Sequence, residues 1–212
     1  MTARDTVRIA AAQYSIGEPA TLEAWRDKVA RWVAEGAATG ATLLVFPEYA
    51  AIEQAAALGR EVSGNLEATL KAVADLERVR VDHHRELAAK HKVHVLVGSG
   101  PSRKAPGVYV NAAQLVTPAG SVGVQEKSIM TPFERDWGIT PGDAIRVFDT
   151  ALGRIGIAIC YDSEFPLLGR GLAAAARGRA GAASRRSCAS RPRRAVGAGA
   201  SGRSCRRPSR AR

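Results

Sequence analysis

Short apolar runs alternate with longer segments of helical spacing along the first 165 residues of the chain. Runs typical of buried strands lie at residues 7–13, 42–46, 93–97, 109–116, 122–127, 145–149 and 154–160. Helical spacing covers residues 22–35, and Gly36 is expected to end this helix. Helical spacing also covers residues 66–92, as one long helix or two shorter ones. Strand-helix-strand order first and hairpins later predict a mixed sheet with helices on its outer face, an α/β layered fold.

Turn and loop signals separate these runs. Residues 117–120 and 152–153 predict tight turns, each with a glycine at its end. Residues 98–106 predict a loop, because Gly98 and Gly100 are followed by two prolines, and residues 128–143 predict an irregular stretch.

The composition changes abruptly after Leu168. From Gly169 onward the chain is almost wholly Ala, Gly, Arg, Ser, Pro and Cys. Such a segment buries too little apolar surface to offset roughly 1–2 kcal/mol per residue of backbone ordering. We therefore expect a folded domain at residues 1–168 and a low-complexity tail at 169–212, disordered apart from a helical turn near residues 172–176.

The charge is distributed unevenly. The formal net charge is +11, but 13 of the 31 basic residues and none of the 20 acidic residues lie beyond Leu168. The body is therefore slightly acidic, and it lacks the basic surface of a nucleic-acid-binding domain.

Cysteine usage and hydropathy bear on the compartment. Cys160 lies in the body and Cys188 and Cys205 in the tail, without a C-x-x-C motif. The N-terminus has no apolar leader segment, and no apolar run approaches 18 residues. These features predict a cytoplasmic protein that does not span a membrane.

Three polar residues follow apolar strands: Glu48, Lys127 and Cys160. Taken singly, each has an ordinary structural explanation, as a carboxylate near a turn, a surface lysine or an inert buried thiol. Together they form a coherent nucleophilic set, because a thiol that is mostly protonated at neutral pH needs a neighbouring base or cation.

Three motifs carry a resemblance to a known family. Residues 46–49 (Phe-Pro-Glu-Tyr), 126–134 (Glu-Lys-Ser-Ile-Met-Thr-Pro-Phe-Glu) and 156–166 (Gly-Ile-Ala-Ile-Cys-Tyr-Asp-Ser-Glu-Phe-Pro) resemble the signature blocks of the nitrilase superfamily, the carbon-nitrogen hydrolases. The resemblance runs in the family's order from about residue 7 to residue 168. It implies an α-β-β-α sandwich that usually dimerises, and hydrolysis of nitriles, amides or carbamoyl compounds without metal or organic cofactor.

The resemblance also implies roles for individual residues. Cys160 would be the nucleophile, Glu48 the general base and Lys127 the transition-state stabiliser, with a thioester intermediate. Glu134 would help to position the substrate, and the backbone N–H of Tyr161 would share the oxyanion with Lys127. Tyr-Asp after the cysteine is more similar to the amidase and carbamoyl-hydrolase branches than to true nitrilases, so we expect an amide substrate.

The resemblance stops after residue 168, where the family continues with further sheet and helix. A shifted reading frame in GC-rich DNA produces Arg-rich sequence without acidic residues. We therefore hypothesise that residues 169–212 are a frameshift product and that the domain is incomplete. Two alternatives remain open: a catalytically inactive fragment, and a nucleic-acid binder acting through the Arg-rich tail.

Two other signals predict no site. His83, His84, His91 and His94 have no recognised metal-ligand spacing, so we interpret them as solvated or capping histidines. Residues 98–100 lack the length and the Lys-Ser/Thr ending of a phosphate-binding loop.

Overall fold

The computed structural model describes residues 6–177. Its helices and strands in chain order are β1 (Ile9–Ala11), α1 (Leu22–Ala38), β2 (Leu43–Val45), the 3₁₀ helix η1 (Ala50–Ile52), α2 (Glu53–Ala56), α3 (Arg60–Ser63), α4 (Leu66–Asp75), α5 (Glu77–His91), β3 (His94–Ala105), β4 (Val108–Val116), β5 (Val122–Glu126), α6 (Pro132–Asp136), β6 (Val147–Thr150), β7 (Gly153–Gly156), the 3₁₀ helix η2 (Cys160–Glu164) and α7 (Pro166–Arg177).

The main sheet has five strands in the order β1-β2-β3-β4-β5. β1, β2 and β3 are parallel, with Leu43 between Ile9 and His94 in register. β3, β4 and β5 are successive antiparallel strands. The parallel half is joined through helices and the antiparallel half through tight turns, which confirms the predicted mixed sheet.

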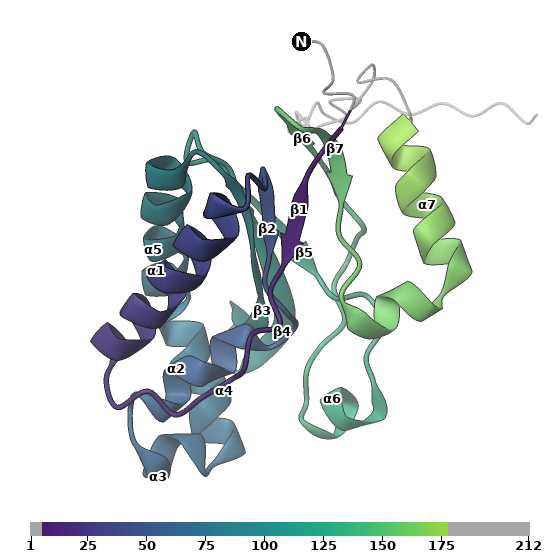
Figure 1. Ribbon diagram of the computed structural model, residues 1–212. Helices are drawn as coiled ribbons and strands as arrows, with labels where there is room; N and C mark the ends of the chain where they lie inside the picture. The colour runs from purple at the N-terminus through teal and green to yellow at the C-terminus, as the bar shows by residue number, and fades with distance from the viewer. Residues whose placement is uncertain (1–5, 178–212) are drawn as a thin grey trace, which may run out of the picture. The chain divides into compact units, whose positions relative to one another are not determined.

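The described residues form four layers (Figure 1). Helices α1–α5 cover one face of the main sheet, and the β6–β7 ribbon lies on its other face with α7 outside it. This arrangement is the α-β-β-α order that the sequence predicted. Within residues 6–177 the second sheet has only two strands, so the second half of the sandwich is much smaller than the first.

Two apolar cores hold the layers together. Between the helices and the main sheet, α1 contributes the buried side chains Trp25, Val29 and Val33. Between the sheets, Leu115 of β4 lies in one cluster with Ile157 and Ile159. Full burial of such a side chain contributes roughly 1.5–3 kcal/mol, so the second cluster anchors the segment that leads to Cys160.

The predicted helices are present, with different ends. The α1 helix is capped by the Thr21 side chain, which accepts the Ala24 backbone N–H. It continues past the predicted stop at Gly36 and ends at Ala38. The glycine leaves room for Leu44, whose Cδ2 lies 3.0 Å from the ideal Cβ position at residue 36. The second helical segment is two helices, α4 and α5.

The predicted loop at residues 98–106 is wrong, because β3 continues to Ala105 and pairs with β4. A proline has no backbone N–H to donate, so it fits a strand only where one side is unpaired. Pro101 meets this condition, because β2 pairs only with residues 94–96 of β3, and β4 is the strand beside Pro101. The predicted irregular stretch also contains helix α6, which begins with a Thr131/Glu134 capping box and has Pro132 at its first position.

The segment around Cys160 differs from its prediction in two respects. The paired strand ends at Gly156, and residues 157–159 continue to η2, which begins at Cys160. The predicted helical turn at residues 172–176 is part of a longer helix, α7, which begins at Pro166. Its alanines favour helix formation. Its Leu172 packs on Gly156, where the Leu172 Cδ2 lies 3.0 Å from the ideal Cβ position. The remainder of the predicted tail, residues 178–212, lies outside the described residues.

Candidate active site

The predicted site residues come from loops at the ends of several strands. Glu48 follows β2, Lys127 follows β5, and Cys160 begins η2. The fourth, Glu134, lies in the short helix α6 and is buried. Strands β2 and β5 end at the same end of the sheet, because β5 is antiparallel to β4, which is antiparallel to β3.

Lys127 is fully buried between two carboxylates. Its Nζ donates to Glu48 Oε1 at 2.7 Å and to Glu134 Oε2 at 2.7 Å. Burial opposes the charge on Lys127, but the hydrogen bonds to Glu134 and Glu48 outweigh it, so the pKa of Lys127 lies above its ordinary value. The lysine is therefore a fixed ammonium between two acceptors.

Glu134 is held in the ionised form by several donors. Burial alone would raise its pKa, but the hydrogen bonds from Lys127 and from the Thr131 backbone N–H, with further bonds from Asn111 and Tyr49, lower the pKa to about 2. The Thr131 hydroxyl donates to the same carboxylate at 2.9 Å. Glu134 therefore acts as a fixed anion and not as an acid at neutral pH.

The Cys160 thiol is exposed and lines the same cavity as Glu48. Local burial raises the pKa of this thiol, the neighbouring Glu48 carboxylate raises it further, and Lys127 and the Tyr161 backbone N–H oppose the rise. The net direction is upward, so the resting sulfur is a protonated thiol beside a base. Such a thiol becomes a nucleophile only when its proton is taken away.

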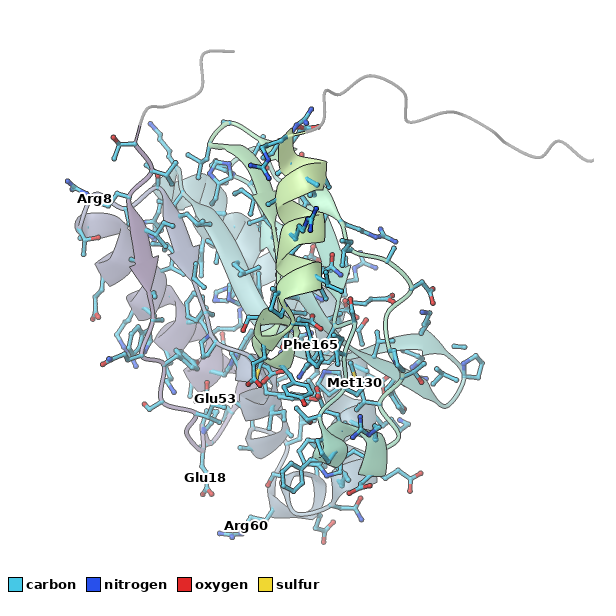
Figure 2. All side chains as sticks on the ribbon, turned by 90° about the vertical axis from the view of Figure 1, so that its right-hand side faces the viewer. Arg8, Glu18, Glu53, Arg60, Met130 and Phe165 are labelled. Atoms are coloured by element: carbon cyan, nitrogen blue, oxygen red, sulfur yellow. The ribbon has the colours of Figure 1, made fainter. Side chains whose placement is uncertain are left out.

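The backbone at Cys160 lies in the left-handed region, with a φ of 47°. That conformation costs a non-glycine residue about 1–2 kcal/mol, so the surrounding structure must hold it in place. The Tyr161 backbone N–H, next along the chain, favours the ionised form of the sulfur. The Tyr161 ring packs edge-to-face on Phe165, with ring centroids 5.1 Å apart, and Figure 2 shows Phe165 at the start of helix α7.

The structure adds three residues that the sequence motifs did not single out. Asn111 of β4 is fully buried and donates to Glu48 and Glu134 at 3.0 and 2.9 Å. The Tyr49 hydroxyl donates to Glu134 Oε1 at 2.8 Å. The Asp162 carboxylate accepts backbone N–H groups from two segments of the site. Tyr49 and Asp162 stand inside the motifs at residues 46–49 and 156–166, where they were given no role, and Asn111 is a polar residue inside the apolar 109–116 run.

A cavity of about 230 Å³ opens beside the thiol. Its lining includes the polar residues Glu48, Ser99 and Cys160, and the apolar residues Phe46, Leu96 and Ile157. A mostly apolar cavity with a few polar groups can orient a small substrate at the sulfur.

Three of the four histidines interpreted as solvated or capping, His83, His84 and His94, are buried, and His91 is half-buried. His84 Nδ1 lies 2.8 Å from the Arg80 backbone oxygen, and His83 Nε2 lies 3.0 Å from the Arg26 oxygen. In the described part of the chain, no group of three His, Cys, Asp or Glu side chains is arranged to hold a metal ion.

Residues 6–177 contain no candidate for a membrane-spanning helix. None of the helices there combines the length and the apolar character that crossing a bilayer requires.

Comparison with known proteins identifies a family. The sequence profile of the family described as carbon-nitrogen hydrolase matches residues 8–177, nine residues beyond the boundary expected from the motifs. The chain is 33% identical over 165 residues to the probable hydrolase YhcX of Bacillus subtilis, covering 77% of this chain and 31% of that protein. It is 33% identical over 180 residues to the bifunctional nitrilase/nitrile hydratase NIT4B of Nicotiana tabacum, covering 79% and 49%.

Solved structures show the same fold. An amidase mutant from Nesterenkonia sp. AN1, with acrylamide added at its active site cysteine, superposes with a TM-score of 0.61 at 21% identity, covering 78% of this chain and 61% of that one. A carbon-nitrogen hydrolase from Helicobacter pylori G27 gives 0.60 at 19%, covering 79% and 56%. The match thus spans 31% and 49% of the lengths of the two curated relatives named above. Its sequence and its fold together make this chain a member of the carbon-nitrogen hydrolase family.

Proposed function

We propose that the protein hydrolyses a carbon–nitrogen bond of a small amide or carbamoyl compound through a thioester on Cys160. The observation that carries this proposal is the cluster itself, in which an exposed thiol shares a cavity lining with Glu48, and Glu48 accepts a hydrogen bond from Lys127. A nucleophile, a base and a cation in contact are the parts that acyl transfer requires.

The first half of the proposed reaction forms the thioester. Glu48 takes the proton from Cys160 as the sulfur attacks the carbonyl carbon. An ammonium has three N–H groups, and Glu48 and Glu134 occupy two of those on Lys127, so we assign the third to the oxyanion. The Tyr161 backbone N–H is the second oxyanion donor, and such donors each contribute roughly 3–4 kcal/mol in other enzymes.

The second half releases both products. Glu48 returns its proton to the leaving nitrogen, and ammonia or an amine departs. Glu48 then takes a proton from a water molecule, which attacks the thioester carbonyl. The carboxylic acid leaves, and the sulfur recovers its proton.

Nitrile hydrolysis is the second candidate, because the tobacco relative at 33% identity is described as a nitrilase. The same thiol would attack the nitrile carbon, and the dipeptide after Cys160 favours amides. Comparing ammonia release from matched amides and nitriles of equal chain length separates the two candidates.

The experiment uses the full chain and a variant in which Cys188 and Cys205 are serine, so that Cys160 is its one remaining thiol. Acrylamide and fluoroacetamide serve as traps, and intact mass reports one adduct. In the chain with Cys188 and Cys205 replaced by serine, we expect ammonia release from an amide and a single adduct with each trap. We expect no ammonia release and no adduct when Cys160→Ala is added to this chain. Ammonia release of undiminished size in Cys160→Ala contradicts the proposal, and absence of both signals in the parent chain supports the inactive-fragment alternative.

Salt-dependent binding of nucleic acid tests the other alternative. Binding of an oligonucleotide that is lost on removal of residues 178–212, with a steep dependence on salt, would favour a role for the Arg-rich segment. We expect no change in amide hydrolysis from saturating oligonucleotide.

A further inference from the structure

Asn111 touches every charged member of the cluster. Its Nδ2 donates one N–H to Glu48 Oε1 at 3.0 Å and the other to Glu134 Oε1 at 2.9 Å. Its backbone oxygen accepts the Lys127 backbone N–H at 2.8 Å. One residue in the interior of the sheet thus fixes two carboxylates through its side chain and the lysine through its main chain.

The orientation of the amide follows from chemistry. Both neighbours of the Asn111 side chain are carboxylates, which accept hydrogen bonds when ionised, so the amide must present its two donors to them. Each N–H has one acceptor, and neither carboxylate can take up a proton on the bonded oxygen without losing a donor. The arrangement therefore favours both carboxylates as acceptors of this one amide.

Burial strengthens this preference. Asn111 is fully buried, as is Lys127. In such a site, hydrogen bonds to charged groups are worth more than they are at the surface, and an unpaired carboxylate is costly. A neutral amide donates to both carboxylates without adding a charge to the site, as a second lysine would. Because the amide is part of a sheet residue, it is also held more rigidly than a water molecule.

We infer that Asn111 is a positioning residue that holds the Glu48 and Glu134 carboxylates on either side of Lys127, so that Glu48 is ready to take the thiol proton. Asn111 contacts Glu48 and Glu134 through its side chain and Lys127 through its main chain. The other titratable groups of the cluster adjoin these residues, Tyr49 beside Glu134 and Cys160 beside Glu48. The inference rests on the proposed thioester chemistry for its catalytic meaning, but the effect of Asn111 on Cys160 can be measured without turnover.

The first test compares Asn111→Leu with Gln114→Leu. Gln114 lies on the same strand, is equally buried and donates to Glu77 Oε1 at 2.8 Å, away from the thiol. Both variants lose a buried amide of similar surroundings. We expect Asn111→Leu to move the acid limb of the kcat/KM profile up by at least one pH unit, and Gln114→Leu to leave that limb in place.

The second test uses the charge of an isosteric variant. Asn111→Asp places a carboxyl group where the amide stood, and it can donate a hydrogen bond only when protonated. We expect its activity to be lowest at neutral pH and to recover in part as the pH falls, whereas the activity of Asn111→Leu falls with pH. If Asn111→Leu fails to fold, Asn111→Ser replaces it, because a serine hydroxyl is too short to reach both carboxylates.

A third readout needs no substrate. In the chain with Cys188 and Cys205 replaced by serine, the rate of iodoacetamide alkylation against pH reports ionisation of Cys160. We expect Asn111→Asp to shift this curve to higher pH and Gln114→Leu not to shift it. If the Asn111 variants keep the acid limb and the alkylation curve of the parent, the inference is overturned; if the curve shifts but no chain hydrolyses amides, the proposed function fails and the inference stands.

Discussion

The carboxylate of Asp162 accepts the backbone N–H of Ile129 at 2.8 Å, which ties the segment after the nucleophile to the segment after the lysine. The same fully buried carboxylate accepts the Ser128 N–H at 3.1 Å and the Ile159 N–H at 3.3 Å. One side chain thus holds Lys127 and Cys160 at a fixed separation, although Ile129 and Asp162 are 33 positions apart in the chain.

Asp162→Asn is expected to lower the free energy of unfolding by about 2–3 kcal/mol, because an amide replaces one acceptor oxygen by a donor that faces N–H groups. Amide hydrolysis should fall with it, since the two segments can then separate. Urea unfolding measures the first effect. Asp149→Asn is the matched control, because Asp149 is an exposed partner of Arg154 and should change stability by no more than about 0.5 kcal/mol.

Lys127→Met should remove activity and destabilise the fold by about 3–5 kcal/mol at pH 7, because it leaves two carboxylates without their shared cation. In the parent chain, the lowered pKa of Glu134 gives stability that is present above its ordinary pKa of 4.5 and is lost as the pH falls towards about 2. Without Lys127 that pKa rises, so the deficit should shrink as the pH is lowered from 7 to 4.

Urea unfolding at pH 7, 5 and 4 tests this dependence. Lys71→Met serves as the control, because the Lys71–Asp75 pair is exposed and contributes less than about 0.5 kcal/mol. A deficit for Lys127→Met that stays constant over this range would show that Glu134 does not depend on the lysine for its charge.

The sequence predicted the parts of the site that lie in contiguous motifs and missed those that depend on pairing. Glu48, Lys127, Glu134 and Cys160 each follow an apolar run or stand in a motif, so they were visible. Asn111 enters the site only because β4 lies between β3 and β5, a register that no local pattern fixes. The catalytic roles of the predicted residues remain predictions.

The fold was predicted best where periodicity is strong and worst where glycine and proline interrupt it. Helices α1, α4 and α5 follow from apolar spacing. The continuation of β3 through Pro101 was missed because a proline normally ends a strand, and only the absence of a β2 neighbour at that position permits it. The burial of His83 and His84 was missed because their polar helix packs on Trp25 and Phe46, which are remote in sequence.

His84 should make the protein less stable in mild acid. Burial lowers the pKa of His84 to about 3, with Arg80 and His83 adding repulsion, while the unfolded chain protonates this side chain near 6.5. The unfolded state therefore binds more protons between these values, so stability should fall as the pH drops from 6.5 to 3, by about 4–5 kcal/mol in all.

His84→Phe tests this interpretation, because a ring of similar size can fill the space beside Phe46, where the two centroids are 5.7 Å apart. Unfolding free energies measured from pH 7 to 4 should fall less steeply in this variant than in the parent. His91→Phe is the control and should keep the parent slope. Equal slopes in all three chains would assign the acid sensitivity to other groups.

Gly98 lies under the loop that carries Glu48, and two separate constraints act on it. Its φ is +86°, and a Cβ there would meet the Pro47 backbone oxygen at 2.5 Å. Gly107 has a similar φ of +71° with nothing within 4 Å of its ideal Cβ position. Gly107→Ala should therefore cost only the conformational energy of about 1–2 kcal/mol.

Gly98→Ala should cost more, about 3 kcal/mol or above, because a backbone carbonyl must also move. The carbonyl that must move belongs to Pro47, directly before Glu48. Tyr49, directly after Glu48, is fixed because its backbone N–H donates to Ser99 Oγ at 3.2 Å. Activity should therefore fall in Gly98→Ala and not in Gly107→Ala, which urea unfolding and ammonia release together can measure. Equal losses in both variants would mean that the φ alone matters and that the loop tolerates displacement of the Pro47 carbonyl.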